Sequence, residues 1–157
     1  MVTPLKDLGH VQWDTIKDSS GSAKAIPVLL RSVAWGDEDT AREALGDLRA
    51  RICQYGFVVE QATAATVPFL WELAQLPQVR CRAQILRLLG SIAAARQWES
   101  TASVYPKLLN YRDDYVGWER AARRAVRADT DVLEQLRAEP DTEVAEAAAE
   151  LATALAA

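Results

Sequence analysis

Residues 42–49 read REALGDLR, and the same arrangement of two arginines separated by six residues recurs as RCRAQILR at 80–87 and RAARRAVR at 120–127. The three copies begin 38 and 40 residues apart. Seven residues make close to two turns of an α-helix, so both arginines of a copy lie on one helix face. A helical segment that recurs at a nearly fixed spacing predicts a fold assembled from repeated units.

A proline motif recurs at nearly the same spacing. The segments IPVLL (26–30), VPFLW (67–71) and YPKLL (105–109) place their prolines 41 and 38 residues apart. Proline is tolerated in the first turn of a helix, where its missing N–H has no helical partner to lose. We therefore expect each segment to begin a helix that precedes one of the arginine helices.

Helical spacing of apolar residues runs through most of the chain, and almost no segment has the alternation typical of a strand. The helices expected from this spacing are at 11–17, 23–34, 39–54, 62–75, 78–96, 102–110, 115–128, 130–138 and 142–156. Short turns between such helices favour antiparallel neighbours. The sequence thus predicts one domain, 1–157, with an N-terminal helix followed by units at 23–54, 62–96, 102–128 and 130–156.

The helix pairs resemble HEAT repeats and the related HEAT-like repeats. The resemblance rests on DTAREAL at 39–45, which begins a second helix, and on GFVVEQAT at 56–63 followed by VPFL at 67–70. The stretch 26–92 is similar to small bacterial HEAT-repeat proteins of mostly unassigned function. This resemblance implies an all-α, right-handed α-solenoid of about three full units, with the second helices lining its concave side. The short last unit, which has glutamate in place of arginine, suits a degenerate C-terminal cap.

The resemblance also implies a role for the first arginine of each copy. In HEAT-like repeats this residue often hydrogen-bonds an aspartate of the preceding turn, and Asp39 is placed to do so for Arg42. Arg42, Arg80 and Arg120 are therefore expected to serve the fold.

Charge is distributed unevenly along the sequence. The net charge is −4, but residues 76–127 carry 10 basic and 4 acidic side chains, whereas residues 128–157 carry 1 and 8. An acidic total disfavours general nucleic-acid binding, since such domains are usually basic. A basic middle instead predicts a concave surface that attracts an acidic partner protein.

The candidate partner-binding residues come from three features of the sequence. The first is the set of arginines without a nearby acid; the second is the linking segment 53–63, CQYGFVVEQAT; the third is a tryptophan one turn before RAARRAVR. They are Arg49, Tyr55, Glu60, Arg82, Arg87, Trp118, Arg123, Arg124 and Arg127. For Tyr55, Glu60 and Trp118 a packing role is an equal alternative. Phe57, Val58, Val59 and Trp71 are expected in the core.

Catalytic chemistry has no support in the sequence. The one histidine, His10, has no partners at ligand spacing, and none of the nucleophile, phosphate-loop or metalloprotease motifs occurs. The acids at 37–39 and 113–114 precede helices, where carboxylates serve as N-caps. The prediction is therefore a non-enzymatic protein-binding module, of an adaptor or immunity type, without metal or cofactor.

An alternative is nucleic-acid binding, because one class of DNA glycosylases is also built of HEAT-like repeats. Trp118, Asp114 and Arg124 are the grouping that such a function would use.

Two further features bear on the compartment. The cysteines, Cys53 and Cys81, lack CxxC spacing, which favours a reducing environment. The N-terminal residues lack the form of a signal peptide, and no apolar run has the length of a membrane span. We expect a cytoplasmic protein without membrane contact.

Overall fold

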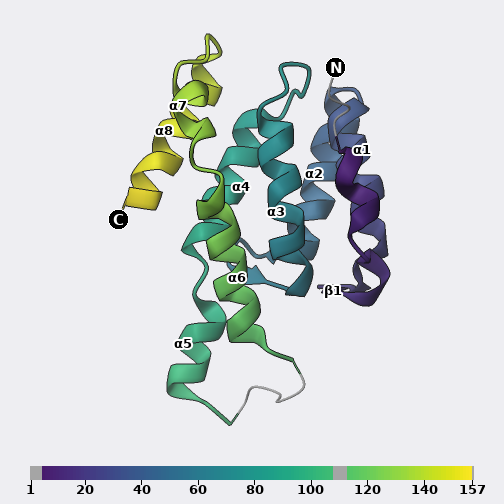
Figure 1. The fold of residues 1–157 in the computed structure, drawn as a ribbon, viewed down its shortest axis with the longest axis vertical. Coiled ribbons are helices and arrows are strands. Elements are labelled where there is room, and N and C mark those ends of the chain that lie inside the picture. Colours follow the sequence, from purple (N-terminus) through teal and green to yellow (C-terminus); the bar gives the residue numbers. More distant parts are fainter. Residues whose placement is uncertain (1–4, 108–112, 157) are drawn as a thin grey trace.

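The computed structural model of the chain describes residues 5–107 and 113–156, which are built mainly of helices (Figure 1). In chain order the α-helices are α1 (Ile26–Trp35), α2 (Glu38–Ile52), α3 (Gln61–Ala74), α4 (Arg82–Ala94), α5 (Gln97–Val104), α6 (Tyr115–Ala128), α7 (Val132–Arg137) and α8 (Thr142–Ala156). Two short antiparallel hairpins, β1 (Lys17–Asp18) with β2 (Gly21–Ser22) and β3 (Cys53–Gln54) with β4 (Val58–Val59), complete the regular structure, along with 3₁₀ turns at Lys6–His10, Trp13–Thr15 and Ala23–Ala25. The predicted all-α class is confirmed.

The N-terminal helix expected at 11–17 is absent. This segment contains the 3₁₀ turn Trp13–Thr15 and then enters β1. So short a helix is not stable by itself, because nucleation outweighs the few hydrogen bonds gained. Tertiary contacts decide the conformation instead: the Trp13 indole N–H donates to the Leu8 carbonyl at 2.9 Å, and its ring packs 6.0 Å from that of Phe69.

The three prolines of the proline motif do not occupy equivalent positions in their helices, so the expectation that each one begins a helix is corrected. Pro27 lies in the first turn of α1, as expected, whereas Pro68 lies inside α3. Pro68 is exposed, so water can reach the carbonyl that loses its N–H partner. Pro106 follows the end of α5, which begins and ends earlier than the helix expected at 102–110. The rest of that expected helix, 108–110, lies outside the described residues.

The helices pack as neighbouring pairs. α1 packs against α2, α3 against α4, and α7 against α8. Figure 1 shows α1 and α2 at one side of the molecule, α3 and α4 in the middle, and α7 and α8 at the other side. The helix that packs most extensively along α4 is α8, whereas α6 lies mainly against α3. The arginine helix α6 therefore does not continue the row formed by α2 and α4, although their sequences align.

One continuous hydrophobic core joins the helices, from Leu8 and Trp13 near the N-terminus to Leu151 in α8. Trp71 is fully buried in it, as predicted, and its indole N–H donates to the Val126 carbonyl of α6 at 3.1 Å. None of the helices in 5–107 and 113–156 combines the length and the hydropathy that a membrane-spanning helix requires.

Candidate functional site

A groove lies between the arginine-bearing faces of α2 and α4. Its volume is about 340 Å³, and its lining residues are Arg42, Leu45, Gly46, Arg49, Gln84, Arg87, Leu88 and Ser91. We call it the basic groove, because three arginines and no acid line it. Small residues on both helices, Gly46 and Ser91, keep the space between the arginines open.

The arginines of the basic groove are weakly held. Arg42 pairs with Glu38 at 3.1 Å and Arg87 with Glu143 at 3.5 Å, and all four side chains are exposed. Arg49 forms no ion pair with any residue of the described ranges. Exposed pairs contribute at most about 1 kcal/mol, so a carboxylate from another molecule can displace them at little cost.

The partner of Arg42 differs from the expected one. Asp39 was expected to bond this arginine, but Glu38 does so. Glu38 lies four residues before Arg42 in the same helix, which is the spacing that brings such side chains together. Arg80 and Arg120 also depart from the expected structural role, since both are exposed and neither makes an ion pair within the described part of the chain.

The β3–β4 hairpin projects an aromatic pair beside the basic groove. Tyr55 and Gly56 have φ angles of 61° and 86°, the left-handed conformation that hairpin turns require and that glycine or asparagine adopts most readily. Tyr55 is 78% exposed and Phe57 46% exposed, with ring centroids 6.2 Å apart. We call residues 55–57 the hairpin tip.

The exposure of Phe57 corrects its expected place in the core. Val59 is buried as predicted, and Val58 is half-buried. The difference arises because Phe57 belongs to the turn rather than to β4. Its side chain therefore does not share the inward direction of Val59.

A second cavity lies between the hairpin tip, α4 and α8. Its volume is about 430 Å³, and it is lined by Gly56, Phe57, Leu86, Arg87, Gly90, Ser91, Ala94, Ala95, Ala147, Glu150, Leu151 and Ala154. We call it the apolar cavity. It shares Arg87 and Ser91 with the basic groove. A third hollow, beside Arg49 and Tyr55, shares Gly56 with the apolar cavity and Gly46 with the groove, so the three form one surface.

Arg82, a candidate for partner binding, serves the fold instead. Its side chain is 7% exposed, donates to the Ala74 carbonyl at 2.8 Å and pairs with Glu139 at 2.7 Å. These contacts tie the end of α3 to the turn between α7 and α8. A partner cannot reach this guanidinium without displacing internal contacts.

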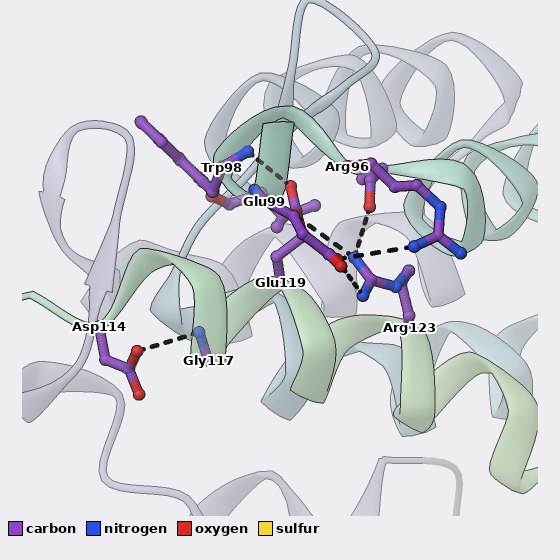
Figure 2. A network of polar contacts seen from close by, with 9 residues as sticks. Arg96, Trp98, Glu99, Asp114, Gly117, Glu119 and Arg123 are labelled. Atoms are coloured by element: carbon purple, nitrogen blue, oxygen red, sulfur yellow. Dashed lines mark hydrogen bonds and ion pairs between the residues drawn. The ribbon is translucent and has the colours of Figure 1, made fainter. Parts of the chain in front are cut away.

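Arg123 is likewise part of the interior (Figure 2). Its side chain is 11% exposed and donates to the Ala95 carbonyl, to Glu99 at 2.7 Å and to Glu119 at 3.3 Å. The buried Glu119 carboxylate also accepts the backbone N–H groups of Trp98 and Glu99, each at 3.0 Å. Glu119 of α6 thus caps the N-terminus of α5 from another helix.

The remaining arginines of α6 form a separate basic surface. Arg120, Arg124 and Arg127 are exposed, and their spacing places them on one helix face. None of the three has an ion pair with a residue that the structure describes. None lines the basic groove or the apolar cavity.

Trp118 packs within an aromatic cluster. Its ring meets that of Tyr115 edge-on at 5.1 Å, and Tyr115 stacks on Trp98 at 4.3 Å. The Trp98 indole N–H donates to the Val59 carbonyl at 2.8 Å. These contacts favour the packing alternative for Trp118, and they join α5 and α6 to β4.

Glu60 lies just before α3 and is half-buried. Its backbone N–H donates to the Thr63 hydroxyl at 2.9 Å, and that hydroxyl donates to the Ile52 carbonyl at 2.6 Å. Burial raises the pKa of the Glu60 carboxyl, and with the added effect of the nearby charges of Asp18 and Asp113 this pKa reaches about 7. These two aspartates are themselves paired, Asp18 with Arg51 and Asp113 with Lys17.

Glu60→Gln is expected to stabilise the fold at pH 8 and to have little effect at pH 5. A carboxyl whose pKa is raised on folding binds its proton more tightly in the folded state, so the wild type loses stability as pH rises from about 4.5 to about 7. Because solvent screens this half-exposed group, the expected gain at pH 8 is about 1 kcal/mol. Urea denaturation of both chains at the two pH values measures it. An equal effect at both values would contradict the assignment.

The helix caps agree with the sequence in two cases. The Asp37 carboxylate accepts the Thr40 N–H, and that of Asp114 accepts the Gly117 N–H (Figure 2). Asp114 therefore serves as the N-cap of α6. Within 5–107 and 113–156, no set of three or more His, Cys, Asp or Glu side chains is arranged to hold a metal ion.

Both cysteines are buried and unpaired. Burial raises the pKa of the Cys53 thiol to about 11, against the opposing effect of Arg49. Cys53 begins the hairpin beneath the tip, next to the hollow beside Tyr55, and its side chain is fully buried.

Comparison with known protein families, curated proteins and solved structures finds no match for this chain. The candidate site is therefore defined by its own geometry.

That geometry brings together Arg49, Tyr55 and Arg87 from the sequence candidates, and it adds residues that the sequence did not indicate. The additions are the small side chains of α4 and α8 that leave the cavities open, with Phe57 and Arg42 at their edges. The signal available in the sequence was the group of small residues Gly90, Ser91 and Ala94, which follow Arg87 in the same expected helix.

Proposed function

We propose that the chain is a non-enzymatic binding module that holds an acidic segment of a partner protein in the basic groove. The convergence of Arg42, Arg49 and Arg87 on one open groove supports this function most directly. Arginine binds carboxylates through paired N–H donors, so a set of three favours an acidic ligand over a neutral one.

The arrangement of the helices supports a HEAT-like architecture for this module. α1 with α2 and α3 with α4 are consecutive pairs, and the groove lies between the second helices of the two pairs. Adaptors and immunity-type proteins are the classes that such a module would serve. The overall acidic charge keeps nonspecific attraction to nucleic acid low.

A displayed library of random peptides, selected on the purified chain, tests this function. We expect the recovered peptides to be rich in Asp and Glu. Synthetic copies with these residues exchanged for Asn and Gln should bind at least tenfold more weakly, since hydrogen bonds to charged groups contribute about 1.5–3 kcal/mol. Arg49→Glu should cause a loss at least as large, measured by fluorescence anisotropy.

Arg31→Glu is the matched control, because Arg31 is exposed on α1 and lines neither cavity. It makes the same change of charge and should leave affinity within about twofold. Unchanged binding of the amide peptides would reject the proposal.

Nucleic-acid binding stays the second candidate, on the evidence of the exposed arginines of α6. The test is the binding of a labelled 20-bp DNA duplex at several salt concentrations. Affinity that falls steeply with salt, and whose salt dependence is removed when Arg120, Arg124 and Arg127 are together replaced by Gln, would favour nucleic-acid binding over the first candidate.

A further inference from the structure

The hairpin tip contains a residue that the fold does not explain. Tyr55 holds a left-handed backbone conformation that is unfavourable for an aromatic residue, and its exposed ring lies beside that of Phe57, which is also exposed. Glycine or asparagine would form the same turn with less strain. Tyrosine and arginine are enriched among the few residues that contribute most of the binding energy in protein interfaces, so an exposed aromatic pair beside arginines is typical of a binding hot spot.

The apolar cavity adjoins this pair. Its floor consists of the buried Leu86 and Leu151, and its walls carry small side chains such as Gly90 and Ala147. Phe57 stands at its edge. A cavity with an apolar floor and small walls accepts an aliphatic or aromatic side chain from another molecule.

Arginines adjoin the cavity on the side of the basic groove. Arg87 lines both spaces, and the Arg49 guanidinium lies 3.3 Å from the position that a Cβ at Gly56 would occupy. On the opposite side the cavity wall carries the exposed Glu150 of α8. A ligand carboxylate is therefore favoured toward α2 and disfavoured toward α8.

We infer that the partner segment carries an apolar side chain directly beside its carboxylates, with the apolar side chain seated in the apolar cavity against the hairpin tip. This inference rests on the proposed function and specifies its ligand. The carboxylates bind Arg49 and Arg87, Phe57 covers the seated side chain, and Tyr55 contacts the segment from the hollow that it shares with Arg49. A phosphate backbone would satisfy the arginines but would leave the apolar cavity without an occupant.

The peptides recovered from the displayed library test the inference. They should share a Leu, Ile, Phe or Trp next to an Asp or Glu. Alanine in place of that apolar residue should weaken binding at least tenfold. Ala154→Leu, which places a larger side chain at the cavity wall, should weaken binding similarly. Thr153→Leu is the matched control, because Thr153 is an exposed neighbour that does not line the cavity.

Tyr55→Gly separates binding from folding. It should weaken peptide binding at least fivefold while leaving the midpoint of urea unfolding equal to that of the wild type or higher. Acidic peptides that show no apolar preference, and that bind Ala154→Leu like the wild type, would overturn the inference and leave the proposed function standing. Recovery of no acidic peptide, or full binding by Arg49→Glu, would overturn both.

Discussion

Glu119→Ala is expected to lower the free energy of unfolding by about 3 kcal/mol, because it leaves buried polar groups without their charged partner. The carboxylate accepts two backbone N–H groups at the start of α5 and the guanidinium of Arg123 (Figure 2). α5 has no fully buried residue within the described chain, so its stability rests on this cap and on the partly buried Trp98. We expect amide hydrogen exchange at Trp98 and Glu99 to accelerate more than exchange in α3.

Asp114→Ala is the matched control for this substitution. Asp114 also caps a helix N-terminus, but its carboxylate is exposed and accepts a single N–H. Its loss should cost about 1 kcal/mol, as is usual for an exposed cap. Equal effects of the two substitutions in urea denaturation would show that the burial of Glu119 adds nothing, and would contradict the assignment.

Trp71→Ala is expected to cost about 4 kcal/mol, in the range that large-to-small substitutions of buried aromatic residues produce. The side chain fills the space between α3 and α6, and its N–H donates to the Val126 carbonyl near the end of α6. A carbonyl at that position has no helical N–H to accept. The substitution therefore removes both packing and a C-terminal cap.

Trp71→Phe separates these two contributions. It keeps much of the ring but leaves the Val126 carbonyl without its donor, and it should cost about 1.5 kcal/mol. Urea denaturation followed by far-UV circular dichroism measures both variants. A cost below about 1 kcal/mol for Trp71→Ala would contradict a close-packed α3–α6 interface.

Most of the helices could be predicted from the spacing of apolar residues, because that spacing directly reflects which helix face is buried. α6 and α8 begin and end where the pattern placed them. The failures are at segments where side chains from distant parts of the chain decide the conformation. Trp13 bonds to Leu8 of the preceding 3₁₀ turn and packs on α3, and α5 begins where Glu119 supplies its cap.

The candidate site could be predicted only in part, because a sequence motif does not show which neighbours its residues meet. Arg123 and Arg124 are adjacent in RAARRAVR, yet one is held by three internal acceptors and the other is exposed. Likewise, arginines of α2 and α4 line the basic groove, whereas the arginines of α6 do not. That distinction depends on α8 taking the place beside α4, which no local pattern indicates.

The burial of Cys53 has a consequence for the chemistry of its thiol. Alkylating reagents attack the thiolate, and a pKa of about 11 leaves little thiolate at neutral pH in the folded chain. Modification of Cys53 therefore requires the hairpin to separate from the helices, and the reaction rate measures how often it does so. In a chain with Cys81 replaced by alanine, this rate reports occupancy of the hairpin tip, because a bound partner must leave before the thiol is exposed.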